Sequence, residues 1–172
     1  MEPILPKGNT LLTETELKLR DAAIQMKLAL KHSEDYQTLR SCINAYLSHA
    51  RSVTFVMQKE SGGNPELKAW YESQMARLKE LPIMRFFNEK RTHTIHKGVV
   101  KPIKHETPVW DVKVNGAVLP GQGKMTFWQF DGVVEFIPGS SGGVFRLCEE
   151  YFKILRWLVM EWIKKRKELG IA

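Results

Sequence analysis

The chain has 172 residues, of which 43% are hydrophobic and 26% charged, and its formal net charge is +7. This length and composition provide for one folded domain with a core of its own and exclude an intrinsically disordered chain. The surplus of positive charge favours a polyanionic partner such as nucleic acid, or a membrane surface. It is explained equally well if the charge serves only to keep a soluble protein dispersed.

The cysteines and the N-terminus exclude further classes. Cys42 and Cys148 fall on apolar faces of expected helices, with no CxxC and no Cys/His ligand spacing, so we expect no zinc site and no other metal or cofactor. Buried free thiols suit a reducing compartment, which predicts a cytoplasmic protein. The N-terminal MEPILPKGNT lacks the pattern of a signal peptide, and charges interrupt every apolar run that might span a membrane.

Two helices are expected between residues 13 and 61. Thr13 and Glu16 have the spacing of a capping box. The first apolar stripe follows it and consists of Leu19, Ala22, Ala23, Met26 and Leu30. Ser33 is the expected N-cap of the second helix, which ends at Ser61, Gly62 and Gly63. Its stripe persists over about five turns and consists of Leu39, Cys42, Ile43, Tyr46, Ala50, Val53 and Met57.

Two further helices follow. Asn64 caps the third, and Pro65 occupies its first position. Its stripe consists of Leu67, Trp70, Tyr71, Gln74 and Leu78. Pro82 marks the start of a fourth helix, which buries Ile83, Phe86 and Phe87, and Gly98 is its natural C-cap.

The pattern then changes to that of a small sheet. Residues 109–114 alternate and lead into Asn115-Gly116, and residues 125–130 lead into Asp131-Gly132, both strong hairpin signals. With residues 133–137 these runs predict an antiparallel sheet of three or four strands, whereas the segment KPIKHETP at 101–108 is interpreted as a loop. PGSSGG at 138–143 predicts a turn before a final helix over 144–169, whose stripe consists of Phe145, Cys148, Phe152, Leu155, Val159, Trp162 and Ile163.

These elements predict a mainly α fold. We expect an antiparallel bundle of four or five helices, with helices over residues 13–98 and 144–169. A small antiparallel β insertion over residues 99–137 precedes the last helix and is too short to fold independently. The whole chain, residues 1–172, is therefore expected to form one domain, in which Trp128 and Phe130 pack the sheet onto the bundle.

The end of the fourth helix carries the only cluster that suggests chemistry. Arg91 and His96 stand as an arginine, four spacers and a histidine. A histidine titrates near neutral pH and can serve as general acid or base, and a guanidinium is a charged fork for phosphate oxygens. Together they suit RNA cleavage through the 2′-hydroxyl without a metal. Residues five apart lie roughly 140° apart on an ideal helix, so the helix must distort or two copies must meet across a dimer axis.

Spacing alone does not establish such a site. Roughly one Arg–His pair of this kind is expected by chance in a chain of this composition. A solvated helix end, whose cations complement the helix dipole, explains the cluster as well. Both interpretations remain open on the residues themselves.

The segment IMRFFNEKRTHTIHKG (83–98) resembles the signature helix of the HEPN superfamily, and CINAYLSHARSVTFVMQ (42–58) resembles its preceding long helix. The resemblance covers residues 17–98. It implies an antiparallel helical bundle, a homodimer, and a composite cleft in which Arg91 holds the scissile phosphate and His96 is the general acid/base. Many members are metal-independent endoribonucleases in toxin–antitoxin, phage-defence or CRISPR-linked systems, which makes RNA and a protein antitoxin the expected partners.

Other members of that superfamily are silent modules that bind RNA, nucleotides or proteins. Active members commonly carry Asn, Asp or His directly after the arginine, where this chain has Thr92. His93 either substitutes for that polar group or is incidental, and Glu89 either orients Arg91 or is a surface carboxylate. The silent module is therefore the alternative function.

Several cations near the cluster are candidates for RNA contacts: Lys90, Lys97, Lys101 and Lys104. The last three of these lysines form, with His105, either a phosphate-facing stripe or a solvated loop. Arg51 is either a second cleft cation or one partner of a surface salt bridge. His49, beside the stripe of the second helix, is interpreted as a histidine at the edge of the core.

Overall fold

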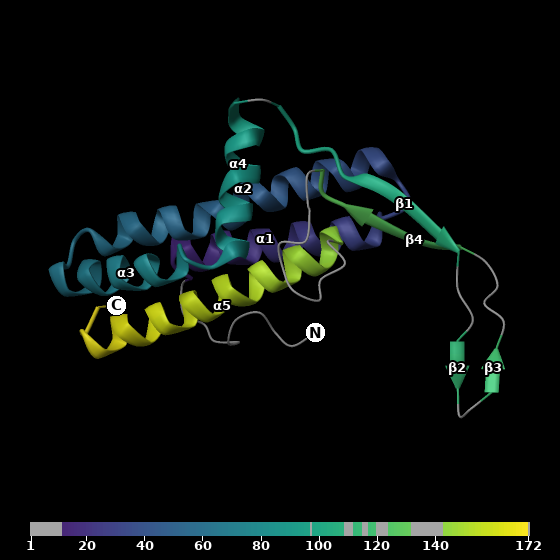
Figure 1. Cartoon of the computed structure of the whole chain (residues 1–172). Helices are drawn as coiled ribbons and strands as arrows, with labels where there is room; N and C mark the ends of the chain where they lie inside the picture. The colour runs from purple at the N-terminus through teal and green to yellow at the C-terminus, as the bar shows by residue number, and fades with distance from the viewer. Residues whose placement is uncertain are drawn as a thin grey trace.

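The computed structural model describes residues 12–96, 98–108, 112–114, 117–119, 124–131 and 143–171. Its elements are α1 Glu14–Lys31, α2 Tyr36–Ser61, α3 Pro65–Leu78, α4 Pro82–His96, β1 Ile103–Pro108, β2 Val112–Val114, β3 Ala117–Leu119, β4 Lys124–Gln129 and α5 Val144–Glu168. Figure 1 shows α1, α2, α3 and α5 running lengthwise beside one another, while α4 stands steeply across them. The mainly α fold with a β insertion before the last helix is confirmed.

Local signals account for most helix boundaries. The Thr13 hydroxyl accepts from the Glu16 N–H at 3.2 Å, and the Glu16 carboxylate accepts from the Thr13 N–H at 2.9 Å, as a capping box requires. Asn64 caps α3 by accepting from the Leu67 N–H at 2.9 Å, with Pro65 at the first position. Gly98, beyond the end of α4, has a φ of +114°, a conformation that favours glycine and agrees with the expected stop.

Two details of the first helices were predicted wrongly. Asp35, and not Ser33, caps α2, because its carboxylate accepts from the N–H groups of both Gln37 and Thr38. Leu30 is 44% exposed, and Ala29 takes its place in the core.

The core is built around α2, which contacts all four other helices. Its entire predicted stripe is buried, and Trp162 of α5 is the largest side chain fully enclosed in the described core. The Tyr46 hydroxyl donates to the carbonyl oxygen of Cys148 at 2.7 Å, which joins α2 to α5. Cys42 and Cys148 are both free and buried.

The β region differs from the prediction. The strands form two separate two-stranded antiparallel sheets, β1 with β4 and β2 with β3, instead of one sheet of three or four strands. The segment interpreted as a loop supplies β1, whose His105 lies opposite Phe127 in the register. The expected turns at 115–116 and 138–142, Gly132 and the expected strand at 133–137 lie outside the described residues.

The predicted packing of the insertion onto the bundle is confirmed. Trp128 is buried, stacks on Tyr36 with ring centroids 5.7 Å apart, and donates its indole N–H to the Ser33 carbonyl at 3.0 Å. Phe130 is also buried and meets Phe86 of α4 edge-on at 5.5 Å. The β1–β4 hairpin is thus anchored to the start of α2 and to α4.

In the part of the chain that the structure describes, no helix combines the length and the apolar composition needed to cross a bilayer.

Candidate functional site

The predicted catalytic residues lie on the last turns of α4. Arg91 is half-buried, whereas Glu89 and His93 are exposed. The backbone of His96 closes α4, but its side chain lies outside the described residues, as does all of Lys97. The pairing of Arg91 with His96 therefore stays a prediction.

The backbone of α4 determines whether Arg91 and His96 of one chain can point toward the same phosphate. The helix is α-helical from Pro82 to His96, so positions 91 and 96 point roughly 140° apart around one axis. Local distortion of the helix was one way to bring the two side chains together. The regular backbone leaves the other way, in which two chains each supply a helix end to a shared cleft.

Thr92 occupies the position directly after the motif arginine. Its hydroxyl donates to the Asn88 carbonyl at 2.9 Å, one turn back in the same helix. This local bond, common for threonine within helices, turns the only side-chain donor of Thr92 toward its own backbone. The side chain is thus engaged within α4.

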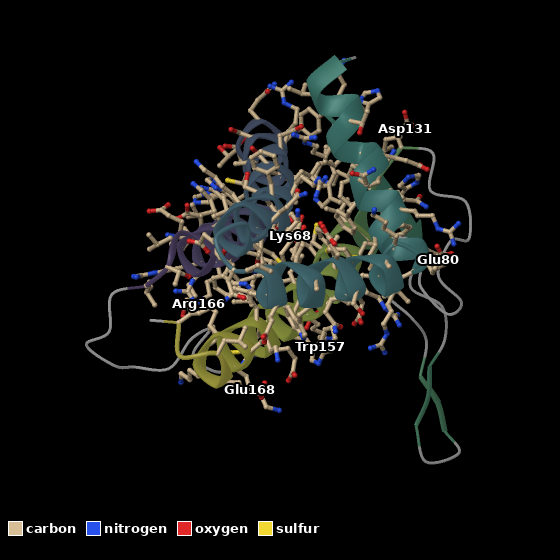
Figure 2. The ribbon with its side chains drawn as sticks, turned by 90° about the vertical axis from the view of Figure 1, so that its left-hand side faces the viewer. Lys68, Glu80, Asp131, Trp157, Arg166 and Glu168 are labelled. Atoms are coloured by element: carbon tan, nitrogen blue, oxygen red, sulfur yellow. The ribbon has the colours of Figure 1, made fainter. Side chains whose placement is uncertain are left out.

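Lys90, a predicted RNA contact, lies against the protein. Its ammonium donates to the carbonyl of Asp131 and lies 5.4 Å from the centre of the Phe86 ring. Burial lowers the pKa of Lys90, and the nearby charges of Asp131 and Glu89 act in the opposite direction. Figure 2 shows Asp131 beside α4. Lys90 therefore ties α4 to the end of β4.

The stripe of cations after α4 is only partly free. Lys101 and Lys104 are exposed, but Lys104 lies 3.9 Å from the carboxylate of Glu34. His105 stacks on Phe127 with ring centroids 5.3 Å apart, because it belongs to a strand and not to the expected loop. Of the lysines in this stripe that the structure describes, Lys101 is therefore the one best placed to contact a phosphate.

A pocket of about 370 Å³ opens beside α4, where α2, α3, α4 and α5 come together. It is lined by Arg51, Thr54, Met75, Lys79, Met84, Arg85, Asn88 and Tyr151. Three of these residues are cations and none is acidic. Sequence reasoning did not identify Lys79, Arg85 or Asn88 as site residues, because the pocket is assembled from helices that lie far apart in the sequence.

Arg51 corrects a prediction. The surface salt bridge weighed for it does not form with any carboxylate in the described part of the chain. Its Nη1 instead donates to the Thr54 hydroxyl at 2.6 Å, and the side chain lines the pocket. His49, on the same helix, lies 3.5 Å from the Asp21 carboxylate at the edge of the core, as expected.

The pocket and the predicted motif share one face of α4. Met84 and Asn88 line the pocket, and Arg91 follows them at the spacing of four and three residues that places side chains on one side of a helix. Arg91 lies about 4.5 Å further along the axis than Asn88, from a rise of 1.5 Å per residue. A ligand that fills the pocket and extends along α4 would therefore reach Arg91.

Metal ligands do not gather here. Among the described side chains, no group of three or more His, Cys, Asp or Glu residues is placed to hold a metal ion. The groups available in this region are guanidinium, ammonium, hydroxyl and amide donors, which suit an anion.

A protein-family model described as bacteriophage lambda protein ea47 matches residues 9–101, just over half of the chain. The matched segment runs from α1 to the end of α4, so it includes every pocket-lining residue except Tyr151. No curated protein and no solved structure matches the chain.

Proposed function

We propose that this chain, which belongs to the family of bacteriophage lambda protein ea47, acts on RNA, because its basic pocket shares a face of α4 with Arg91. The proposed activity is that of a HEPN-like, metal-independent endoribonuclease. The observation that carries the proposal is that Arg91 follows Met84 and Asn88, two lining residues of the basic pocket, on one face of α4. A strand that leaves the cationic pocket along that face would bring a further phosphate to Arg91.

In the proposed reaction, His96 takes the proton from the 2′-hydroxyl, or returns a proton to the leaving 5′-oxygen. The 2′-oxygen attacks the adjacent phosphorus, and the bond to the 5′-oxygen breaks, which leaves a 2′,3′-cyclic phosphate. Arg91 stabilises the negative charge that builds on the phosphate oxygens in the transition state.

The proposal includes a homodimer. Since α4 stays helical to His96, Arg91 of one subunit and His96 of the other are the pair we expect at a shared cleft. We place the activity in the cytoplasm, where free buried thiols such as Cys42 and Cys148 persist. The proposed setting is a toxin–antitoxin or phage-defence system with a protein antitoxin.

The bond from Thr92 to Asn88 favours a second candidate. The side chain after the motif arginine is engaged by its own helix and does not present the amide or carboxylate of active relatives in the resembled superfamily. The second candidate is therefore a module of the same architecture that binds RNA through the same face and leaves it intact.

The two candidates are separated by incubating the purified chain with a generic single-stranded RNA in EDTA, and by following products on a denaturing gel. If the chain is the enzyme, Arg91→Ala and His96→Ala each lower cleavage at least about 100-fold, since each removes a group that acts in the transition state. Arg77→Ala, which removes an exposed α3 cation outside the pocket, is the matched control and keeps cleavage intact.

Mixing the two inactive variants tests the shared cleft. Exchange of subunits between Arg91→Ala and His96→Ala dimers forms mixed dimers with one intact Arg–His pair, so partial cleavage returns. Cleavage that neither variant reduces would remove Arg91 and His96 from the mechanism. RNA binding without cleavage by the unmodified chain would establish the silent module.

A further inference from the structure

Arg51 carries an unsatisfied group inside the pocket wall. Its Nε is buried and has no hydrogen-bond partner, the one such side-chain atom among the described residues. Its Nη1 is occupied by Thr54, and no described carboxylate pairs with the guanidinium. A buried donor on a charged group is costly to leave unpaired, and native structures usually pair it. An anion in the pocket would offset the uncompensated charge of this guanidinium, although Nε itself is shielded from solvent.

The charge of the pocket points to the kind of anion. Arg51, Lys79 and Arg85 line it from α2, α3 and α4, and the lining contains no carboxylate to offset them. The Arg85 guanidinium donates to a backbone carbonyl, that of Glu80, at 2.8 Å, so its charge also remains unneutralised. Three positive charges around one opening match a group with more than one negative charge, such as a phosphate monoester, better than a single carboxylate.

The rest of the lining describes what the phosphate is attached to. Met75, Met84 and Tyr151 give the pocket an apolar wall, and thioethers pack well against flat aromatic groups. The Tyr151 hydroxyl makes no hydrogen bond with the described residues, and Asn88 offers both an amide donor and an acceptor. A volume of about 370 Å³ is at the small end of the range for ligand pockets.

We propose that this pocket binds one nucleotide unit, with its phosphate against Arg51, Lys79 and Arg85 and its base against Met75, Met84 and Tyr151. The inference rests on the proposed function in one respect, because it assumes that the nucleotide belongs to an RNA chain. A free mononucleotide presents the same chemistry. The site is separate from the Arg91–His96 pair and lies before it along α4, so it would hold a nucleotide next to the scissile phosphate.

Isothermal titration calorimetry on the full chain tests the pocket directly. The probes are adenosine 5′-monophosphate, inorganic phosphate, adenosine, and a hexanucleotide RNA whose 2′-oxygens are methylated so that it cannot be cleaved. We expect the monophosphate to bind more tightly than either inorganic phosphate or adenosine, because only the monophosphate engages both walls. Lys79→Gln and Arg85→Gln should each weaken its binding by about 10-fold, the effect of losing one charged hydrogen bond.

Both substituted cations are exposed, so these variants should keep the fold, which circular dichroism checks. Arg77→Gln makes the same change in charge on α3 outside the pocket and should bind like the unmodified chain. Competition between hexanucleotide and monophosphate identifies RNA as the source, whereas monophosphate binding without competition identifies a free nucleotide.

Absence of binding to the monophosphate and the hexanucleotide, or equal weakening by Lys79→Gln, Arg85→Gln and Arg77→Gln, would overturn the pocket assignment. That result leaves the cleavage assay untouched. Conversely, monophosphate binding in a chain that cuts no RNA would reject the nuclease and keep the pocket.

Discussion

Buried tyrosine side chains pack the centre of the bundle and keep their hydroxyl protons. Burial raises the pKa of Tyr46 well above its usual value, and it raises that of Tyr151 to about 12 against an opposing effect of Arg51. Tyr151 also stacks on Phe87, with ring centroids 4.2 Å apart and planes 5° from parallel. These residues contribute packing and neutral donors, and not a nucleophile, at neutral pH.

Tyr151→Phe should therefore change how stability depends on pH more than stability at pH 7. A tyrosine pKa raised from 10 to about 12 means that the folded state holds a proton that the unfolded state releases, so stability falls as pH rises from about 10 to 12. Titration of Tyr151 accounts for about 2 kcal/mol of the stability lost by pH 12. The Tyr151→Phe variant lacks this titration, so its free energy of unfolding should fall less steeply with pH. Urea unfolding from pH 7 to 11.5 measures it, and parallel curves for variant and parent would contradict the assignment.

At the scale of elements, a single side chain fastens the segment after α4 to the central helix. Asn44 of α2 donates to the Val100 carbonyl at 2.8 Å and accepts from the Val100 N–H at 2.9 Å. Both Val100 groups are buried, since that residue is 3% exposed. The amide thus pairs both backbone groups of Val100, as a strand partner would, in the segment between α4 and β1.

Asn44→Ala should destabilise the chain by about 2–3 kcal/mol, because two buried backbone groups lose their partners at once. Ser48→Ala, at an exposed position one turn further along α2, should cost less than about 0.5 kcal/mol. Denaturant unfolding followed by circular dichroism compares the two. A similar midpoint for both variants would show that water replaces the Asn44 amide at no cost.

The hairpin shows why pairing across the chain escapes local rules. IKHETP alternates poorly and carries two charges and a proline, so its composition favours a loop. It becomes β1 because β4 provides a backbone partner along its whole length. Trp128, which anchors β4 to the start of α2, fixes the position of both strands.

At the scale of the whole molecule, the surplus of +7 is not spread at random around the proposed site. Arg51, Lys79 and Arg85 meet at the pocket. Arg91 lies further along α4, the helix that carries Arg85. If the three pocket cations hold one phosphate of a single strand and Arg91 holds a second, the logarithm of the binding constant should fall with the logarithm of salt concentration at a slope of about −1.4.

Fluorescence anisotropy of a labelled single-stranded RNA measures that slope. Between 50 and 200 mM KCl the affinity should drop by about 7-fold, and Arg91→Gln should make the slope shallower by about 0.7. Lys27→Gln on α1, which contributes nothing to the pocket, should leave the slope unchanged. A slope near zero would mean that RNA phosphates do not contact this face.

The sequence by itself determined the helices and most of the core. Caps such as Thr13 and Asn64 act on N–H groups within one turn, and the stripe of α2 is periodic, so both are local properties that a reader of the sequence recovers. Part of the candidate site was also in view, since Arg91 and His96 stand close together in the chain and Arg51 was weighed as a cleft cation.

Only the tertiary structure decided the pocket, the partner of β1 and the role of Lys90. The lining of the pocket is drawn from α2, α3, α4 and α5, and Lys90 meets Asp131 across forty-one positions. Contacts of that separation leave no periodicity or spacing in the sequence, because they depend on how whole helices cross. α4 stands steeply across the bundle (Figure 1) and packs against α2 and α5, and the pocket lies where these helices and α3 come together.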